Sequence, residues 1–152
     1  MRIPAKMLIT IKVGDRPTKG MFVILKFLMA RKNSYNLVFG PSDEQGRVEA
    51  TRDEIIKDAR KSMELFLMDY GEIKTYWTGQ LQVTPMNRES IGRALSAIRL
   101  FRDVYEYPHG HEELLRAADA ALAQMGDAEL TTVVQTETDE SIAVETVSVR
   151  AT

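Results

Sequence analysis

The stretch "HGHEE", residues 109–113, gathers the side chains of this chain that are best suited to chemistry. His109, His111 and Glu112 could bind a metal ion, provided that the backbone is extended enough for both imidazoles to share a side and that another ligand comes from elsewhere. Alternatively, this stretch is a loop leading into a helix, where Glu112 and Glu113 suit the positive end of the helix dipole. The sequence indicates no other cofactor.

Other catalytic arrangements are missing from the sequence. The chain has no cysteine, which excludes disulfides and thiolate chemistry, and it has neither a glycine-rich phosphate loop nor a Gly-x-Ser-x-Gly elbow. Asp43, Glu44, Asp69 and Glu72 could form a carboxylate pair only if the fold brought them together, and their neighbours are typical of turns. We therefore expect a protein that is not an enzyme. An enzyme that uses His109, His111 and nearby acids, acting on a small molecule or through a metal, is the alternative.

The charge balance gives no reason to expect nucleic acid as a partner. The chain has 20 Lys and Arg against 22 Asp and Glu, a net charge of -2, whereas phosphate binding needs a basic surplus or a basic face. Arg88, Arg93, Arg99 and Arg102 fall on one predicted helix but spread around its circumference. A nucleic-acid-binding regulator is therefore a third hypothesis only.

The length and the hydropathy pattern suit one soluble unit. A chain of 152 residues is close to the size of one ordinary domain. Its most apolar run, residues 20–30, contains Lys26 and is about half as long as a membrane-spanning helix. The first residues lack the continuous apolar core of a signal peptide. We expect a cytoplasmic protein without a membrane partner.

Residues 6–85 show the patterns of short strands joined by turns. In "KMLITIKV", residues 6–13, apolar and polar residues alternate with the period of a strand. "TRDE" is a capping box in which Thr51 caps a helix and Glu54 reaches back. The complete prediction places strands at residues 6–13, 20–30, 34–40, 47–51 and 63–71, one strand or two with a bend at Gly79 in 72–85, a turn at 41–46 and a short helix at 52–61.

The remaining chain is predicted to form helices and then strands. Apolar residues at helical spacing predict helices at 88–106 and 111–125, with Asn87 as a cap, and the short loop between them predicts a helical hairpin. The Val- and Thr-rich C-terminal tail predicts a β-hairpin or an extended arm. The expected organisation is a β-sandwich (1–86), the helical hairpin (87–126) and the tail (127–152), in one structural unit.

The motifs "GDRPTKGMFVIL", "YNLVFGPSDEQGRVEATRDEI" and "MELFLMDYGEIKTYW" resemble those of the transthyretin-like and carboxypeptidase regulatory-like β-sandwiches. The resemblance covers residues 6–77 and implies an α+β chain built on an antiparallel, transthyretin-like or immunoglobulin-like β-sandwich with an inserted short helix. Transthyretin-like hydrolases of the urate pathway carry His and Arg in their strands and end in "Y-R-G-S". This chain lacks both features, so the resemblance implies the fold without the hydrolase activity.

The C-terminal tail is the segment best suited to protein interaction. A Val- and Thr-rich strand with little charge tends to pair with other chains when its edge is exposed. We therefore predict a non-enzymatic structural or interaction module that self-associates, or docks on another protein, with the tail as strand donor. The residues expected to make this contact are Val133, Val134, Ile142, Val144, Val147 and Val149.

Overall fold

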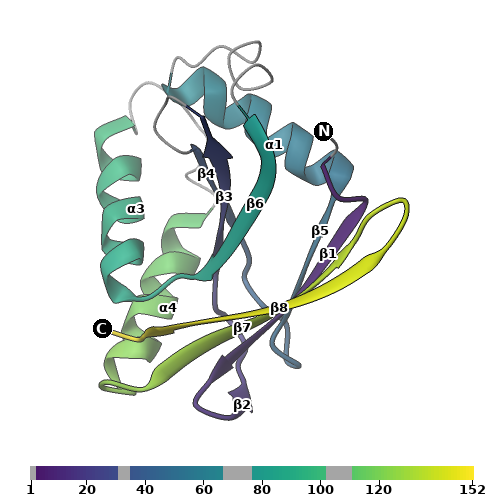
Figure 1. The fold of residues 1–152 in the computed structure, drawn as a ribbon. Coiled ribbons are helices and arrows are strands. Elements are labelled where there is room, and N and C mark those ends of the chain that lie inside the picture. The colour runs from purple at the N-terminus through teal and green to yellow at the C-terminus, as the bar shows by residue number, and fades with distance from the viewer. Residues whose placement is uncertain (1–2, 31–34, 67–76, 102–110) are drawn as a thin grey trace.

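The computed structural model describes residues 3–30, 35–66, 77–101 and 111–152, and it shows an α+β fold with two antiparallel sheets (Figure 1). One sheet contains β1 (Lys6–Val13), β2 (Arg16–Pro17), β5 (Arg47–Thr51), β7 (Glu129–Glu137) and β8 (Ile142–Arg150). The other contains β3 (Val23–Met29), β4 (Tyr35–Phe39) and β6 (Trp77–Pro85). The helices are α1 (Arg52–Phe66), α3 (Arg88–Phe101) and α4 (Glu112–Ala123). The predicted α+β class and the antiparallel sheets are confirmed.

The five-stranded sheet is organised around β1 and β7. β1 pairs with β7 along its whole length, from Lys6 opposite Glu137 to Val13 opposite Leu130, and its other edge pairs with β5 and β2. β7 pairs on its second edge with β8, which is the last strand of the sheet. The C-terminal segment therefore supplies one central strand and one edge strand of this sheet.

The three-stranded sheet has the order β4-β3-β6, with β3 antiparallel to both neighbours. Alternation of buried and half-buried residues along β3 directs Val23, Leu25 and Phe27 into the core. β6 lies close to β7 and β8 of the other sheet. The two sheets therefore approach each other where β6 lies next to β7 and β8.

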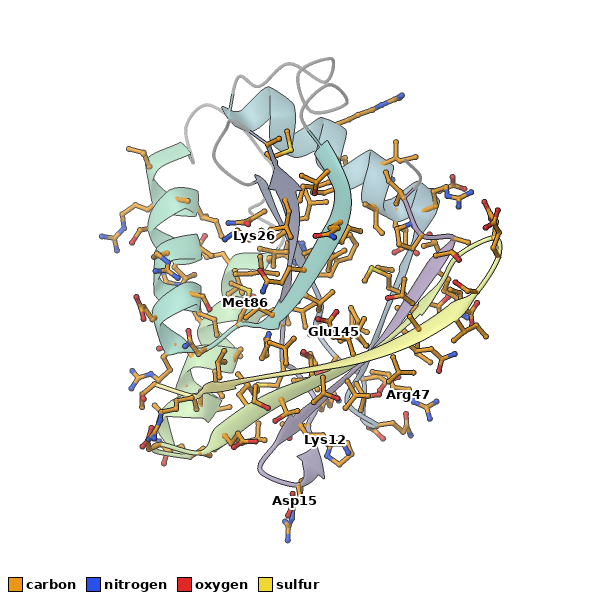
Figure 2. The ribbon with its side chains drawn as sticks, in the orientation of Figure 1. Lys12, Asp15, Lys26, Arg47, Met86 and Glu145 are labelled. Atoms are coloured by element: carbon orange, nitrogen blue, oxygen red, sulfur yellow. The ribbon has the colours of Figure 1, made fainter. Side chains whose placement is uncertain are left out.

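The core lies between the sheets and extends to the helices. α1 contacts β5 of one sheet and β4 of the other, and it buries Ile55 and Ala59. α3 and α4 pack against each other beside the three-stranded sheet (Figure 1). Met86, which is 1% exposed, lies between this sheet and the two helices, whereas Asp15 lies at the tip of the β1–β2 turn (Figure 2).

Both helix caps that the sequence predicts are present. The Thr51 hydroxyl accepts a hydrogen bond from the Glu54 amide at 3.3 Å and donates one to the Glu54 carboxylate at 3.0 Å. At α3, the Asn87 side-chain oxygen accepts from the Ser90 amide at 3.0 Å. Each cap satisfies an amide of the first helical turn that has no partner within the helix.

The end of α1 corrects the sequence prediction. The helix extends to Phe66, whereas the sequence predicted its end at residue 61 and a strand at 63–71. Met63 and Phe66 follow Ile55 by eight and eleven positions, so they also continue a helical stripe, and a short apolar run does not distinguish the two periods. The rest of the predicted strand, and residues 72–76 of the next one, lie outside the described residues, as do the predicted helix end at 102–106 and His109.

The turn at residues 41–46 connects the two sheets through hydrogen bonds. The Ser42 hydroxyl accepts from the Met21 amide at 2.9 Å and donates to the Thr18 carbonyl at 2.6 Å. The Asp43 carboxylate accepts from the amides of Gln45 and Arg47, both at 2.9 Å. The turn at residues 41–46 therefore has a structural role, because it links the segments that flank the strands of both sheets.

Replacing Ser42 by alanine is expected to lower the free energy of unfolding by about 1–3 kcal/mol, because the variant leaves the buried Met21 amide without its acceptor. Chemical denaturation of both proteins measures this difference. Thr78 is a matched control, since its hydroxyl donates to the Leu28 carbonyl from an exposed site. A Ser42→Ala variant as stable as a Thr78→Ala variant would contradict the structural role of Ser42.

Candidate interaction edge

The predicted metal ligands are not assembled into a site among the described residues. His109 lies outside them. Glu112 lies in the first turn of α4, where its carboxylate accepts from Arg116 at 3.2 Å. No group of three His, Asp or Glu side chains that could hold a metal ion occurs in the part of the chain that the structure describes.

His111 is instead packed into the fold. Its ring lies edge-on to the ring of Phe22, with centroids 5.9 Å apart. Burial lowers the pKa of His111 below 6.5, and the nearby Asp58 carboxylate of α1 partly opposes this shift. Burial also raises the pKa of Asp58 above 3.8, against the effect of Lys61. These contacts place His111 in the packing between α1, Phe22 and the start of α4.

The environment of His111 predicts a dependence of stability on pH. Because the pKa is lower in the folded state, the unfolded chain binds a proton first as the pH falls below about 7, and the free energy of unfolding decreases until the folded pKa is passed. The raised pKa of Asp58 acts in the opposite direction, giving stability at acidic pH that is lost as the pH rises through its folded pKa. A His111→Gln variant is therefore expected to lose less stability than the natural chain between pH 7.5 and 5.5. The free energy of unfolding of both proteins is measured by urea denaturation at each pH. An equal change in this free energy between pH 7.5 and 5.5 for the two proteins would contradict the contribution assigned to His111.

Two of the arginines predicted on this helix are paired with acidic side chains, while Arg99 is exposed in the last turn of α3. Arg88 pairs with Asp119 of α4 at 3.1 Å, and Arg93 pairs with Glu89 at 3.1 Å. Arg102 lies outside the described residues. These pairs neutralise the charge that a phosphate backbone would need.

The six residues predicted to make a protein contact lie at different depths in the structure. Val134 is buried in the core. Val133, Val147 and Val149 are half-buried. Ile142 and Val144 are 65% and 67% exposed. Within β8, residues 142–146 are exposed on both faces of the sheet, which makes this half of the strand the accessible part of the predicted surface.

β8 also has an unpaired edge among the described residues. The Ala151 amide bonds the Ala128 carbonyl at one end of the β7–β8 pairing, and the Thr138 amide bonds the Ser141 carbonyl at the other. Because antiparallel pairs alternate, the odd-numbered residues of β8 direct their backbone groups to β7 and the even-numbered ones direct theirs to the open edge. Ile142, Val144 and Thr146 therefore present backbone donors and acceptors beside exposed side chains.

The open edge of β8 is longer or more accessible than the other strand edges. β2 has two residues, while β4 and β5 have five each. β6 also has nine residues, but it ends in Pro85, and proline protects a strand edge from pairing. β8 has nine residues, contains no proline or glycine, and carries Glu145 as the single charge between Ile142 and Val149. Edge strands are normally protected from pairing by charge, proline or bulges, and β8 has little of this protection.

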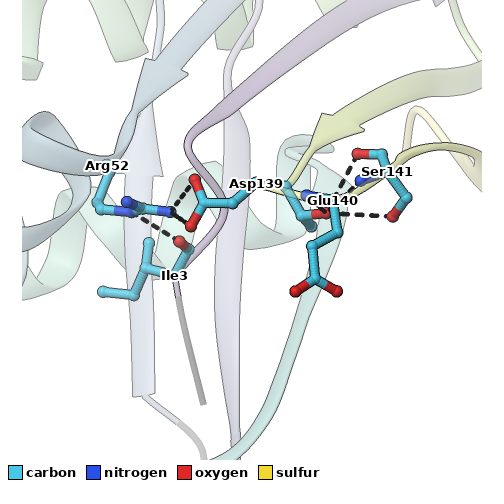
Figure 3. Close-up of polar contacts among 6 residues, drawn as sticks. Ile3, Arg52, Asp139, Glu140 and Ser141 are labelled. Carbon is cyan, nitrogen blue, oxygen red and sulfur yellow. Dashed lines mark hydrogen bonds and ion pairs between the residues drawn. The ribbon is translucent and has the colours of Figure 1, made fainter.

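The tip of the β7–β8 hairpin is fixed to the body of the protein (Figure 3). Arg52, the first residue of α1, donates to the Ile3 carbonyl at 2.8 Å and lies 3.3 Å from the Asp139 carboxylate. Within the turn, the Thr138 hydroxyl accepts from the amides of Glu140 and Ser141 at 3.3 and 3.0 Å. These contacts hold β8 in a defined position. Edge pairing is favoured by this, because the strand loses little conformational entropy when it binds a partner.

Comparisons with known proteins leave the site to be interpreted from its geometry. Among the described residues, no helix is both long and apolar enough to cross a membrane. No protein-family model, no curated protein and no solved structure matches this chain.

Proposed function

We propose that this protein is a non-enzymatic structural or interaction module that self-associates through β8. The observation that carries the proposal is the nine-residue edge of β8, which pairs with no other strand in the described part of the chain and whose residues 142–146 are exposed on both faces. Pairing of this edge with another strand would satisfy its backbone groups and cover Ile142 and Val144. Within the hairpin β7 is an inner strand, paired with β1 and β8, so we assign the proposed role of strand donor to β8.

We also propose that residues 6–77 form a sandwich of the transthyretin-like type. The order of β5, α1 and β6 supports this, because a helix between two strands is a feature of transthyretin. The two antiparallel sheets are compatible with such a sandwich. An experimental structure in which these strands superpose on a transthyretin-like domain would support the assignment, and a different strand order would refute it.

Light scattering of the full chain, together with an Ile142→Lys/Val144→Lys variant, tests the proposed function. We expect the natural chain to associate as its concentration is raised and the variant to remain monomeric, because two lysines on an edge strand disfavour pairing. The variant should keep the circular dichroism spectrum of the natural chain, since both positions are exposed.

A matched control carries the same two added charges at a different surface. Leu100 and Leu114 are 74% and 44% exposed on α3 and α4, so a Leu100→Lys/Leu114→Lys variant should associate like the natural chain. A natural chain that stays monomeric up to millimolar concentration would refute self-association. Association lost in the helix variant and retained in the β8 variant would assign it to the helices instead.

A further inference from the structure

We propose that the partner at the open edge is the β8 strand of a second copy, paired antiparallel about a two-fold axis at Val144. This inference rests on the proposed self-association and adds the partner strand, the direction and the register. A two-fold axis is the commonest symmetry of homodimers, and it lets one surface patch serve both subunits. The result would be one β-sheet continuous across both molecules.

The backbone restricts the register of such a pairing. Only the even-numbered residues of β8 direct their amide and carbonyl groups to the open edge. In an antiparallel dimer these residues must therefore face each other across the new ladder. The axis can pass through Val144, Glu145 or Thr146 while residues 142–146 stay largely paired, and each choice juxtaposes different side chains.

Side-chain chemistry separates these three registers. An axis at Glu145 places two Glu145 carboxylates directly opposite each other, which is unfavourable. An axis at Thr146 places the apolar Ile142 and Val144 opposite Arg150 and Ser148 of the second copy. An axis at Val144 places Val144 opposite Val144 and Ile142 opposite Thr146. Of these three registers, the axis at Val144 is the one that brings apolar side chains together. An axis at Ala143 would also place Ile142 opposite Val144, but it would pair Glu145 and Thr146 with Ser141 and Glu140 of the turn, which lie outside the strand.

Exposure and charge also favour the axis at Val144. This register uses residues 142–146, which are exposed on both faces, whereas Val147 and Val149 are already half-buried within their own molecule. The acidic tip with Asp139 and Glu140 then lies alongside the C-terminal half of β8 in the second copy. That half ends in Arg150, so the acidic tip of each copy lies beside a basic residue of the other, although Arg150 and Asp139 each already pair with a residue of their own copy, Asp127 and Arg52.

Disulfide trapping tests the register. The chain contains no cysteine, so a single introduced cysteine can link only to its counterpart in another copy. With the axis at Val144, the two residues 144 are adjacent, the two residues 146 are about 14 Å apart along the strands, and the two residues 148 are about 27 Å apart, from a rise of about 3.4 Å per residue. Val144→Cys should therefore form a covalent dimer under mild oxidation at least tenfold faster than Thr146→Cys or Ser148→Cys.

A double variant keeps the test valid if Val144→Cys weakens the dimer. Ile142→Cys/Thr146→Cys retains Val144 and should form two intermolecular disulfides, because residue 142 of each copy faces residue 146 of the other. Faster trapping of Thr146→Cys alone would move the axis to Thr146 and overturn this inference, while the proposed self-association would stand. Equally slow trapping of every variant from a chain that light scattering shows to be dimeric would also overturn it. A monomeric natural chain would instead refute the proposed function itself.

Discussion

A chain that ends at Gly126 is expected to lose cooperative folding. The removed segment contains β7, which pairs with β1 along all of its length. It also contributes Leu130 and Val134, which are 0% and 2% exposed. Burial of such side chains contributes about 1.5–3 kcal/mol each, so these two alone account for a large part of a typical total stability of about 5–15 kcal/mol. Circular dichroism and thermal unfolding of the shortened chain measure the effect.

The Ile142→Lys/Val144→Lys variant is the control for this prediction, because it changes the same hairpin at exposed positions only. It should unfold cooperatively near the temperature of the natural chain. A shortened chain that also unfolds cooperatively would contradict the central position of β7, and would mean that the C-terminal segment is a separable tail.

Gly46→Ala is expected to cause a larger loss of stability than Ser42→Ala. Gly46 has a φ of +76°, and a Cβ at this position would lie 2.6 Å from the Ile11 carbonyl oxygen and 2.9 Å from the Thr18 amide nitrogen. The Gly46 carbonyl also accepts a hydrogen bond from the Ile11 amide at 2.7 Å. The left-handed backbone alone costs alanine about 1–2 kcal/mol, and the clash with backbone atoms should bring the total to about 3–4 kcal/mol.

Gly126→Ala separates these two contributions. Gly126 has a similar φ of +61°, but nothing lies within 4 Å of the position of its Cβ. This variant should therefore show the backbone contribution only, about 1–2 kcal/mol. Urea denaturation of both variants gives the comparison, and equal losses would contradict the close packing of Gly46 between β1 and the following turn.

The sequence predicts those parts of the fold that depend on local chemistry. The alternation in residues 6–13, the Thr51 and Asn87 caps and the turn at Ser42 and Asp43 all involve groups only a few residues apart. The end of α1 could not be predicted in this way, because the apolar residues of "MELFLM" fit a strand and a helix equally well. Whether such a segment forms a helix or a strand depends on its tertiary packing.

The candidate site is only partly accessible to sequence reasoning. The Val-rich composition of residues 127–152 indicates strands, and β7 and β8 are indeed paired. Which valines are buried depends on the pairing of β1 with β7, which joins residues more than one hundred positions apart in sequence. The contact of Arg52 with Asp139 is similarly remote. A long edge with little charge is therefore recognised only when the strand order is known.

Amide hydrogen exchange within β8, followed by NMR at increasing protein concentration, tests self-association through this edge most directly. The amides of Ala143 and Glu145 bond β7 and should be protected at every concentration, whereas those of Val144 and Thr146 face the open edge. We predict that Val144 and Thr146 exchange rapidly in dilute solution and become protected as the dimer forms. Rapid exchange of both amides in a solution that light scattering shows to be dimeric would contradict the account.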